Sequence, residues 1–450
     1  MLPLEKRLLE AYRDLWDSYV DPCEPYFDDA GEWSPVAAAR DGAGQAAPLD
    51  AAGHAEIRRQ CRALAATNEF AINGHENRIS YLVGAGHTYR AAPKKGRTAA
   101  PELARLVQEV VDEFVVEARW HARQQEIVRR LDRDGEAFLR FFSEGGRTRV
   151  RFVEPGQIAT PPADAAGAAA SAGILNEPDD VETVLAYAVD GRWIDAGEIQ
   201  HRKANVDANV KRGLPLFYPV RKNLRRAERL LRNMSTVAEI QSAIALIRKH
   251  RAGTKSGAQQ FVAAAADASV ASSATGQTTY FKRFAPGTIL DAPSGVEYDF
   301  PAAALDAASY VAVLQAELRA IASRLVMPEF MLTSDASNAN YASTMVAEGP
   351  AMRMFARLQA DLVRDDLAVM WRVVRGAVAA GRLPAAALLD VELQAGPPTL
   401  ATRDPLSEAQ AARIELDSGV LSPQTWSQRR GLDYDQEQAN FAEHARRKMA

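Results

Sequence analysis

Apolar residues along the first 210 positions follow two different periods. Three segments have the three-to-four-residue period of an amphipathic helix: residues 1–20, 54–83 and 100–131. Residues 21–50 are rich in Pro, Gly, Asp and Ala without a period, which predicts a loop or an arm. Apolar positions alternate from Ile79 to Val83, so a strand that enters a turn at Gly84 and Gly86 is expected at the end of the second segment.

The period changes from helical to strand-like near residue 135. Residues 135–158 read GEAFLRFFSEGGRTRVRFVEPGQI, in which two aromatic and β-branched runs flank Glu144-Gly145-Gly146 and predict a hairpin. Residues 160–180 are rich in Ala and contain Pro, and they predict a loop. Residues 182–202 predict a second β-region with a turn at Asp190-Gly191. The first 210 residues are therefore expected to mix helices and strands.

Helical periodicity dominates the second half of the chain. It is found at residues 219–250, 302–326 and 344–380, and in shorter pieces at Asp404–Ser418 and Ser422–Arg430. Residues 251–279 are rich in Ala, Ser, Thr and Gly, which predicts an exposed loop after a helix that ends at Gly253. A short β-like piece follows, with turns at Pro286-Gly287 and Ser294-Gly295. The whole chain is expected to have an α+β fold.

A polar segment separates the two long helical patterns of the second half. Residues 328–343 read PEFMLTSDASNANYAS, and Ser343 or Thr344 is a candidate N-cap for the helix that follows. This connection is longer than a tight helix hairpin needs, and long loops in compact proteins are often functional. A plain surface crossover is the alternative interpretation.

Composition places the chain among globular proteins. It has 450 residues, of which 47% are hydrophobic and 25% charged, with a formal net charge of −4. No apolar stretch is long enough for a membrane span, and the N-terminus mixes both charge signs, unlike a signal peptide. Cys23 and Cys61 cannot form a disulfide framework, so synthesis in a reducing compartment is expected. The charge also argues against a protein that holds nucleic acid mainly by bulk positive charge.

Motifs for catalysis, cofactors and metals are missing from the sequence. The nearest approach to a phosphate-binding P-loop, at residues 252–256, lacks the upstream Gly and the Gly-Lys pair. The spacing of His54, Cys61, His75 and His87 matches no metal-ligand pattern. Residues 132–136 lack the later acidic positions of a calcium loop and predict a turn into the next strand. We expect no catalytic, cofactor-binding or metal site.

Basic residues cluster on one side of the helix expected after Pro219. They are Arg221, Arg225, Arg229 and Arg232. Spacings of three and four residues place them on one helix face. The face is either a solvated surface or a strip that contacts phosphate or protein.

Several segments in a fixed order resemble the portal proteins of tailed bacteriophages, of the lambda-like branch. They are NEFAINGHENRISYLVGAG (68–86), HRKANVDANVKRGLPLFYP (201–219), FAPGTILDAPSGVEYDFP (284–301), RAIASRLVMPEFMLTSDASNANYAST (319–344) and GVLSPQTWSQRRGLDYDQ (419–436). The resemblance spans most of residues 55–440. One departure is Met327-Pro328, where Gly-x-Pro is common in the family.

The resemblance implies a portal fold with a defined order of subdomains. They are an α/β wing at 1–218, a stem helix at 219–250, a small β-containing clip at 251–301, a second stem helix at 302–327, a tunnel loop at 328–343, a long helix with part of the wing at 344–390 and a helical C-terminal wing and crown region at 391–450. Family members form a ring, usually of twelve subunits, at one capsid vertex of the virion, after assembly in the host cytoplasm.

The resemblance also implies what such a ring contacts. Double-stranded DNA passes through its channel during packaging and ejection. The terminase large subunit, which supplies the energy, the major capsid protein and a head-completion or tail adaptor protein dock on the ring. No membrane, cofactor or enzymatic activity is implied. The competing interpretations are an α+β hydrolase or transferase without a recognised motif, and another virion structural protein.

Physical chemistry adds a requirement for a conduit. Each phosphate contact made by Lys or Arg must be broken at every step, so a channel should offer short polar groups instead. The expected tunnel loop fits, because its DNA-channel candidates are Ser334, Asp335, Ser337, Asn338, Asn340, Tyr341 and Ser343. Asp335 would repel phosphate and keep the duplex centred. For the basic helix face, we rank contact with neighbouring subunits or the capsid above contact with DNA.

Overall fold

The structure, a computed structural model, divides the chain into two units. One contains Met1–Lys222 with Ile321–Ala450, and the other contains Asn223–Ala320. The structure describes residues 25–27, 33–35, 51–94, 101–161, 170–178, 180–249, 269–271, 278–280, 288–292, 307–335, 337, 340–400, 405–430, 432 and 434–449. The helix predicted at 1–20 and most of the loop predicted at 251–279 therefore lie outside the described residues.

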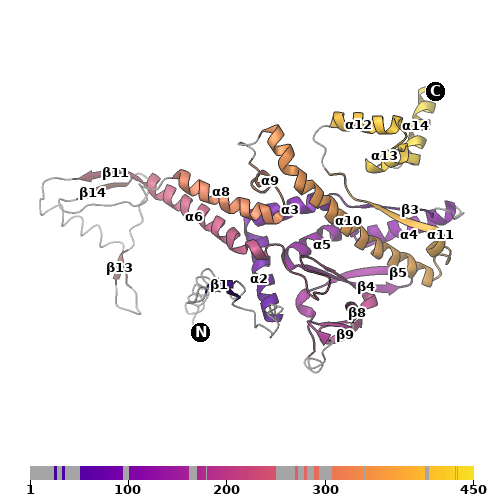
Figure 1. Cartoon of the computed structure of the whole chain (residues 1–450), viewed down its shortest axis with the longest axis horizontal. Helices are drawn as coiled ribbons and strands as arrows, with labels where there is room; N and C mark the ends of the chain where they lie inside the picture. Colours follow the sequence, from indigo (N-terminus) through magenta and orange to yellow (C-terminus); the bar gives the residue numbers. More distant parts are fainter. Residues whose placement is uncertain are drawn as a thin grey trace. The chain divides into compact units, whose positions relative to one another are not determined.

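Four helices precede the main sheets of the first unit among the residues that the structure describes (Figure 1). They are α2 (Ala51–Thr67), α3 (Glu69–Leu82), α4 (Pro101–Glu117) and α5 (Trp120–Asp134). Asn68 starts α3, because its side chain accepts a hydrogen bond from the Ala71 amide. The strand predicted at 79–83 is wrong, since α3 continues to Leu82 before the turn at Gly84 and Gly86.

The single helix predicted at 100–131 is also wrong. Arg119 has a φ of 49°, in the left-handed region, and divides the segment into α4 and α5. Burial explains the break, because both Phe114 and Trp120 are buried and their rings pack 5.5 Å apart. A continuous helix does not bring these two positions onto one face, since they are six residues apart.

Two antiparallel sheets follow α5. One has the order β10-β4-β5, built from β4 (Glu136–Glu144), β5 (Arg147–Val153) and β10 (Ile199–Lys203). The other has the order β6-β7-β8-β9, built from β6 (Ala170–Ser171), β7 (Ile174–Glu177), β8 (Asp180–Val189) and β9 (Arg192–Asp195). The hairpin predicted within residues 135–158 and the β-region predicted at 182–202 are confirmed, although Pro155–Gln157 of the first segment form a short 3-10 helix. The loop predicted at 160–180 is wrong where β6 and β7 form.

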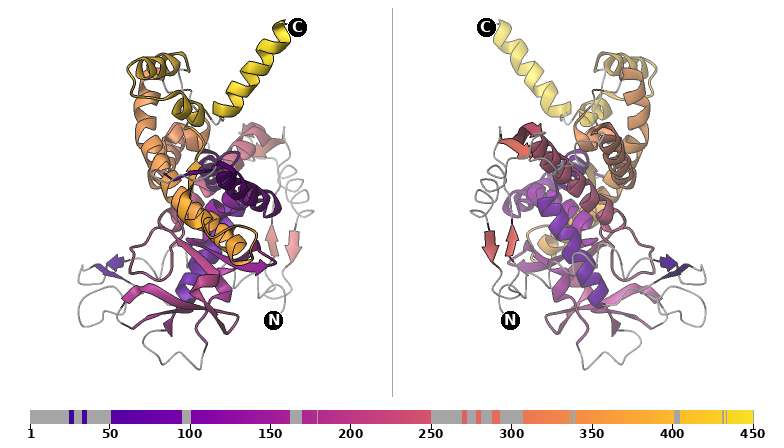
Figure 2. Two further views of the ribbon diagram at one scale, coloured as in Figure 1. Left: turned by 90° about the vertical axis from the view of Figure 1, so that its right-hand side faces the viewer. Right: turned by 90° about the vertical axis from the view of Figure 1, so that its left-hand side faces the viewer.

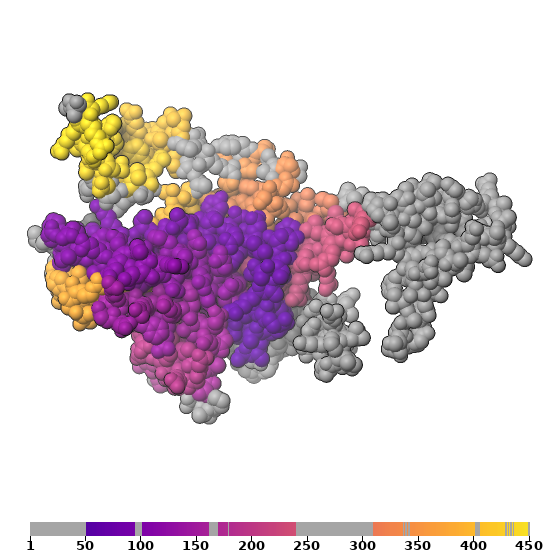
Figure 3. Space-filling view, turned by 180° about the vertical axis from the view of Figure 1, so that it is seen from behind, coloured from indigo at the N-terminus to yellow at the C-terminus, as the bar shows by residue number. Residues whose placement is uncertain are grey.

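The two sheets share one apolar core. Its buried members include Phe138, Val153, Ile174, Tyr187 and Ile199. The strands lie together, in magenta, in the lower part of both views in Figure 2. On the face drawn in Figure 3, the indigo atoms of α2 and the purple atoms of the elements that follow form a continuous surface. Burial of the core side chains, Phe138 and Ile174 among them, fixes the register of both sheets, because a slip of one residue would turn them to the opposite face.

A second part of the chain completes this unit. It comprises α9 (Glu329–Thr333), α10 (Tyr341–Ala379), α11 (Ala387–Asp390), β15 (Val391–Gly396), α12 (Pro405–Asp417), α13 (Pro423–Arg429) and α14 (Tyr434–Met449). β15 pairs antiparallel with β3 (Thr88–Pro93), so strands about 300 positions apart in sequence are joined. The long helix α10 contacts α3, α4, β5 and β15. Sequence analysis missed β15 and α14.

The second unit contains most of two helices and several short strands. The helices are α6 (Arg221–Ala243) and α8 (Ala307–Leu325). β11 (Ile244–Lys249) pairs in parallel with β14 (Thr288–Ala292), and β12 (Ser269–Ala271) pairs with β13 (Thr278–Tyr280). The helix predicted to run to residue 250 is wrong beyond Ala243, where β-branched and aliphatic residues form β11 instead.

Two further short elements complete the description. β1 (Pro25–Phe27) pairs antiparallel with β2 (Trp33–Pro35) inside the segment predicted to be a loop or an arm. In the part of the chain that the structure describes, no helix has the length and apolarity that a membrane crossing requires.

Gly135, between α5 and β4, occupies a position where a side chain would strain the backbone and clash with its neighbours. It ends α5 with a φ of 81°, and a Cβ atom there would lie 2.3 Å from the Leu214 carbonyl carbon. Gly135→Ala should lower the free energy of unfolding by about 2–4 kcal/mol, from the left-handed backbone and the steric clash together. Gly191→Ala is the matched control, since Gly191 has a φ of 77° with nothing within 4 Å of the added Cβ.

Urea denaturation of the two variants separates backbone strain from the clash. Gly191→Ala should cost only about 1–2 kcal/mol. Equal losses in the two variants would contradict the close approach of Leu214 to Gly135.

Candidate DNA-channel segment and the networks behind it

The polar segment between α9 and α10 is shorter than the sequence predicts. Residues 329–333 form α9, in which Met331 and Leu332 are buried, so the loop proper runs from residue 334 to 340. Ser334 ends α9 with a φ of 59°, a left-handed conformation that reverses the chain. The predicted loop of 328–343 is therefore corrected at both ends.

Asp335 and Ser337 form a local turn on this loop. The Ser337 amide donates to Asp335 Oδ1 at 2.9 Å, and the Asp335 amide donates to Thr333 Oγ1 at 3.3 Å. Hydrogen bonds from the Ser337 side chain and main chain hold the pKa of Asp335 below its ordinary value. Asp335 is exposed, so the loop presents a carboxylate to its surroundings at neutral pH.

Asn340 and Ser343 start the long helix. The Ser343 amide donates to Asn340 Oδ1 at 2.8 Å, and the Asn340 amide donates to Ser343 Oγ at 3.2 Å, which makes a reciprocal capping box. The predicted N-cap, Ser343 or Thr344, is wrong: Asn340 is the cap and α10 begins at Tyr341. Asn340 and Ser343 are both exposed. Asn338 and the side chain of Tyr341 lie outside the described residues.

The first turns of α10 extend beyond the packed part of the unit. Met345 is 50% exposed and Val346 is 79% exposed, whereas Ala351 is buried. Pro350 lies at this boundary and has no amide hydrogen to donate to the carbonyl of Val346. Loop 334–340 is thus carried on a stretch of helix that is supported mainly from Ala351 onward.

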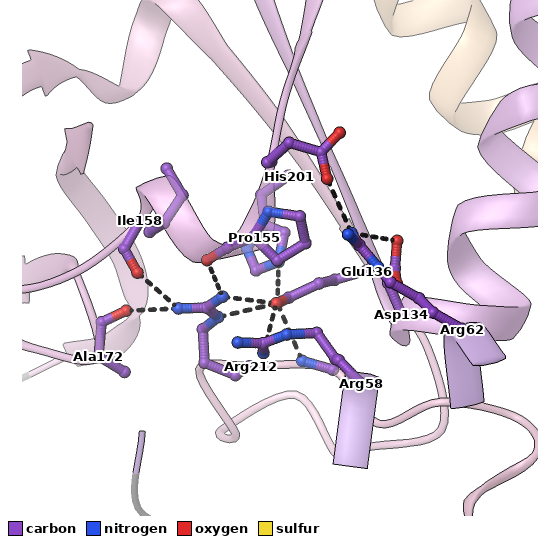
Figure 4. A network of polar contacts seen from close by, with 11 residues as sticks. Arg58, Arg62, Asp134, Glu136, Pro155, Ile158, Ala172, His201 and Arg212 are labelled. Atoms are coloured by element: carbon purple, nitrogen blue, oxygen red, sulfur yellow. Dashed lines mark hydrogen bonds and ion pairs between the residues drawn. The ribbon is translucent and has the colours of Figure 1, made fainter. Parts of the chain in front are cut away.

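Elsewhere in the first unit, a buried carboxylate joins α2 to the sheets. Glu136, at the start of β4, accepts hydrogen bonds from Arg212, at 2.6 Å for Nη2 to Oε1, and from the Gly213 amide at 3.3 Å (Figure 4). His201 Nε2 lies 3.3 Å from Glu136 Oε2, and Arg58 Nη1 lies 3.5 Å from Oε1. The Arg212 guanidinium also donates to the carbonyls of Pro155, Ile158 and Ala172.

These partners decide the charge of the carboxylate. Burial alone would raise the pKa of Glu136, but the hydrogen bond with His201 and the charge of Arg212 lower it to about 2. Burial also lowers the pKa of His201, against the opposing effect of Glu136. At neutral pH the site therefore contains a carboxylate, two guanidinium groups and a neutral imidazole.

A second buried carboxylate fixes α10 to three other elements. Asp366 Oδ1 accepts from Arg202 Nη2 of β10 at 2.9 Å. Asp366 Oδ2 accepts from the Tyr89 hydroxyl of β3 at 2.9 Å and from Gln124 Nε2 of α5 at 2.7 Å. Burial would raise the pKa of Asp366, but the charge of Arg202 and the nearby His87 outweigh it and lower the pKa.

The basic face predicted on α6 is only partly present. Arg221 is buried: it donates to the Tyr218 carbonyl at 2.6 Å and lies over the Tyr218 ring. Arg225 is half-buried, Arg229 is exposed, and exposed Arg232 pairs with Glu228 at 2.8 Å. Because Arg221 points into the protein, it is removed from the predicted strip.

Sequence analysis missed the pairing between α6 and α8. Glu317 of α8 accepts from Arg226 Nε at 2.9 Å and from Asn223 Nδ2 at 2.7 Å. The two helices lie side by side in Figure 1. It also missed the buried carboxylates, although three acids within residues 132–136, at a helix-to-strand junction, were a usable signal. Among the described residues, no group of three or more His, Cys, Asp and Glu could hold a metal ion.

The family model for "Phage portal protein, lambda family" matches residues 35–359, which is most of the chain. The chain belongs to this family. The resemblance noted in the sequence is thereby confirmed. This portal protein is a structural component of the virion rather than an enzyme, and portals as a family form the DNA channel at a capsid vertex. No curated protein matches the chain significantly.

Solved structures with weak similarity include chains of gene transfer agent particles and a phage portal protein. The chain is 14% identical to a chain in the neck of an empty GTA particle (TM-score 0.46; 87% of this chain and 97% of that chain covered). It is 15% identical to one in the virion of a native gene transfer agent particle (0.44; 88% and 96%). It is 13% identical to an HK97-family portal protein from Corynebacterium diphtheriae (0.32; 78% and 97%). At these values the assignment depends on the family match.

The Glu136 site should make stability depend on acidity. Its folded pKa, about 2, lies below the ordinary value of 4.5, so its contribution is present above pH 4.5 and is lost as the pH falls toward 2. Glu136→Gln should remove this contribution of Glu136 to the pH dependence and cost about 3–5 kcal/mol at pH 7, because it leaves Arg212 without its charge partner.

Urea denaturation between pH 2 and pH 7 measures this change. Glu198→Gln is the control: Glu198 is half exposed and pairs with Arg140 at 3.3 Å, so its loss should cost less than about 1 kcal/mol. An unchanged pH profile in Glu136→Gln would show that Glu136 is not the group responsible.

Proposed function

We propose that this chain assembles into a ring, of twelve subunits, through which double-stranded DNA passes during packaging and ejection. The observation that carries the proposal is the family match over residues 35–359, which includes the exposed polar loop at 334–340. That loop lies between α9 and α10, and its described residues Ser334, Asp335, Ser337 and Asn340 are all polar and exposed. The loop would line the channel.

The subdomains are proposed to follow the order implied by the family. Residues 1–218 would form the wing, 219–250 and 302–327 the stem, and 251–301 the clip. Residues 328–343 would contain the tunnel loop, and the remaining residues would form the long helix, the rest of the wing and the crown region. The separate unit Asn223–Ala320 supports this division, because it coincides closely with the stem and clip segments.

Electrostatics favour a passage over a binding site. Twelve copies at −4 each carry a formal charge of −48, which opposes tight non-specific binding of DNA. At the loop, the carboxylate of Asp335 and the side chains of Ser337 and Asn340 offer no positive charge to phosphate. Contacts without counterion release are weak and are readily broken as the duplex advances.

The docking partners are proposed from the family alone. They are the terminase large subunit, the major capsid protein and a head-completion or tail adaptor protein. For the basic residues of α6, the structure favours protein over DNA as the contact. Arg232 of this face pairs with Glu228, and Arg226 beside the face pairs with Glu317, so carboxylates are the groups that these arginines of α6 contact.

Ring formation is the first test of this proposal. Purified chain, measured by light scattering and by negative-stain imaging, should form closed rings with a central hole. A monomer or dimer under all assembly conditions would overturn the proposal.

A charge reversal on the loop tests the channel assignment. Asp335→Lys would place one lysine per subunit at the proposed channel surface, so rings should bind duplex DNA at least about tenfold more tightly at low salt, with a steeper salt dependence. Fewer DNA-filled heads should result, because each step must then break phosphate contacts. Fluorescence anisotropy and the DNA content of heads measure the two effects.

Asp417→Lys, on α12, makes the same change in net charge at an exposed side chain. It should leave DNA content unchanged. Equal effects of the two variants would mean that net charge, rather than a lysine at the loop, controls passage.

A further inference from the structure

Two asparagines of α3 hold the end of α9. Asn73 Nδ2 donates to the Met331 carbonyl at 3.1 Å and to the Leu332 carbonyl at 2.6 Å. Asn77 Nδ2 donates to the same Met331 carbonyl at 2.9 Å. The last carbonyls of any helix lack partners within the helix, so these amides supply what α9 cannot supply itself. Asn73 Nδ2 also lies 3.5 Å from Ser334 Oγ, where the exposed loop begins.

The same helix also holds α10, on the other side of the loop. The rings of Tyr81 and Phe355 stack with centroids 4.9 Å apart and an interplanar angle of 8°. Gln359 Nε2 donates to the Tyr81 carbonyl at 2.9 Å. Contacts join α3 to both α9 and α10, which lie beside it in Figure 1. Both segments that flank loop 334–340 are therefore attached to one helix.

α3 is itself held firmly in place. Arg78 donates to both oxygens of Asp132 on α5, at 3.0 and 3.1 Å, and His75 Nδ1 lies 3.3 Å from the same carboxylate. Gly74 lies against the last residue of α8, since an added Cβ atom would lie 2.5 Å from Leu325 Cδ1. A residue larger than glycine at position 74 would therefore require the Leu325 side chain to move.

We infer that Asn73 and Asn77 are positioning residues for loop 334–340. The ion pair between Arg78 and Asp132 fixes the position of α3, and the two asparagines of α3 in turn fix the position of α9 and of the loop that follows it. The inference rests on the proposed function, since it assigns these amides a role in placing the segment that would face DNA. The side-chain amide of asparagine suits this role, because it is neutral and binds the α9 carbonyls without adding charge beside the proposed channel.

Because the two asparagines are only half-buried, their role in positioning the loop can be tested without unfolding the first unit. Both asparagine side chains are half-buried, so water can enter the space that a shortened side chain leaves and bond the Met331 and Leu332 carbonyls. The unit should therefore stay folded, while the end of α9 and the loop open more often. A residue needed only for stability would affect the whole unit.

Hydrogen–deuterium exchange in assembled rings of the full chain tests the inference. Asn73→Asp with Asn77→Asp replaces each donor by a group that repels the carbonyls. Amides in residues 331–340 should exchange at least about tenfold faster, whereas residues 136–144 of β4 should be unchanged. Asn73→Ala with Asn77→Ala should act in the same direction if the aspartates prevent assembly. Asn233→Asp, at an exposed asparagine of α6, is the matched control and should leave both regions unchanged.

DNA content of heads that contain these rings gives the functional outcome. Faster exchange in 331–340 with fewer DNA-filled heads would support the inference. Unchanged exchange in 331–340 would overturn it, whatever the DNA content. Faster exchange with normal DNA content would confirm the anchoring but overturn the role of the loop in DNA passage, and deleting residues 335–340 should then also leave packaging normal.

Discussion

Buried carboxylates that must each be paired with an arginine are the constraint on which the first unit depends. Glu136 meets Arg212, Asp132 meets Arg78, and Asp366 meets Arg202, at hydrogen-bond distances between buried groups. An unpaired charge in such a place costs about 3–5 kcal/mol, so each pair fixes the spacing of the elements that carry it. The three carboxylates come from β4, α5 and α10, and their arginines come from the loop after β10, from α3 and from β10.

This arrangement divides the first unit into a fixed part and an exposed part. The pairs lock α3, α5, α10 and the three-stranded sheet to one another. Loop 334–340 and the first turns of α10 lie outside this locked region, where Val346 is 79% exposed. A conduit for DNA has use for both properties: a rigid body holds the ring together, and short polar side chains on an exposed loop contact a moving duplex only weakly.

Local sequence patterns predicted the secondary structure correctly where a segment's own residues are enough to determine it. The Gly-Gly hairpin, the turn at Asp190-Gly191 and the long helix that became α10 follow from periodicity and turn chemistry. Ordered segments also identified the family. They indicated the polar loop as a candidate site, although its assignment to the channel remains a prediction.

Sequence patterns gave wrong predictions where contacts between residues remote in the sequence determine the local structure. Helix α3 extends through Ile79 because it packs between α5, α9 and α10, and the alternating apolar positions there suggested a strand. β15 forms only because β3 offers it an edge. The arginine pairs could not be predicted from the sequence, because each joins residues that are remote along the chain, such as Glu136 and Arg212. The helical spacing placed Arg221 on an exposed basic face, whereas in the structure its guanidinium is buried over the Tyr218 ring.

An electron cryomicroscopy reconstruction of the assembled full-length chain tests the central claim most directly. The account predicts a closed ring in which residues 334–340 of every subunit reach the narrowest part of the channel, with Asn73 and Asn77 behind them against α9. A ring with these residues on its outer surface, or a channel whose narrowest part is formed by other segments, would contradict it.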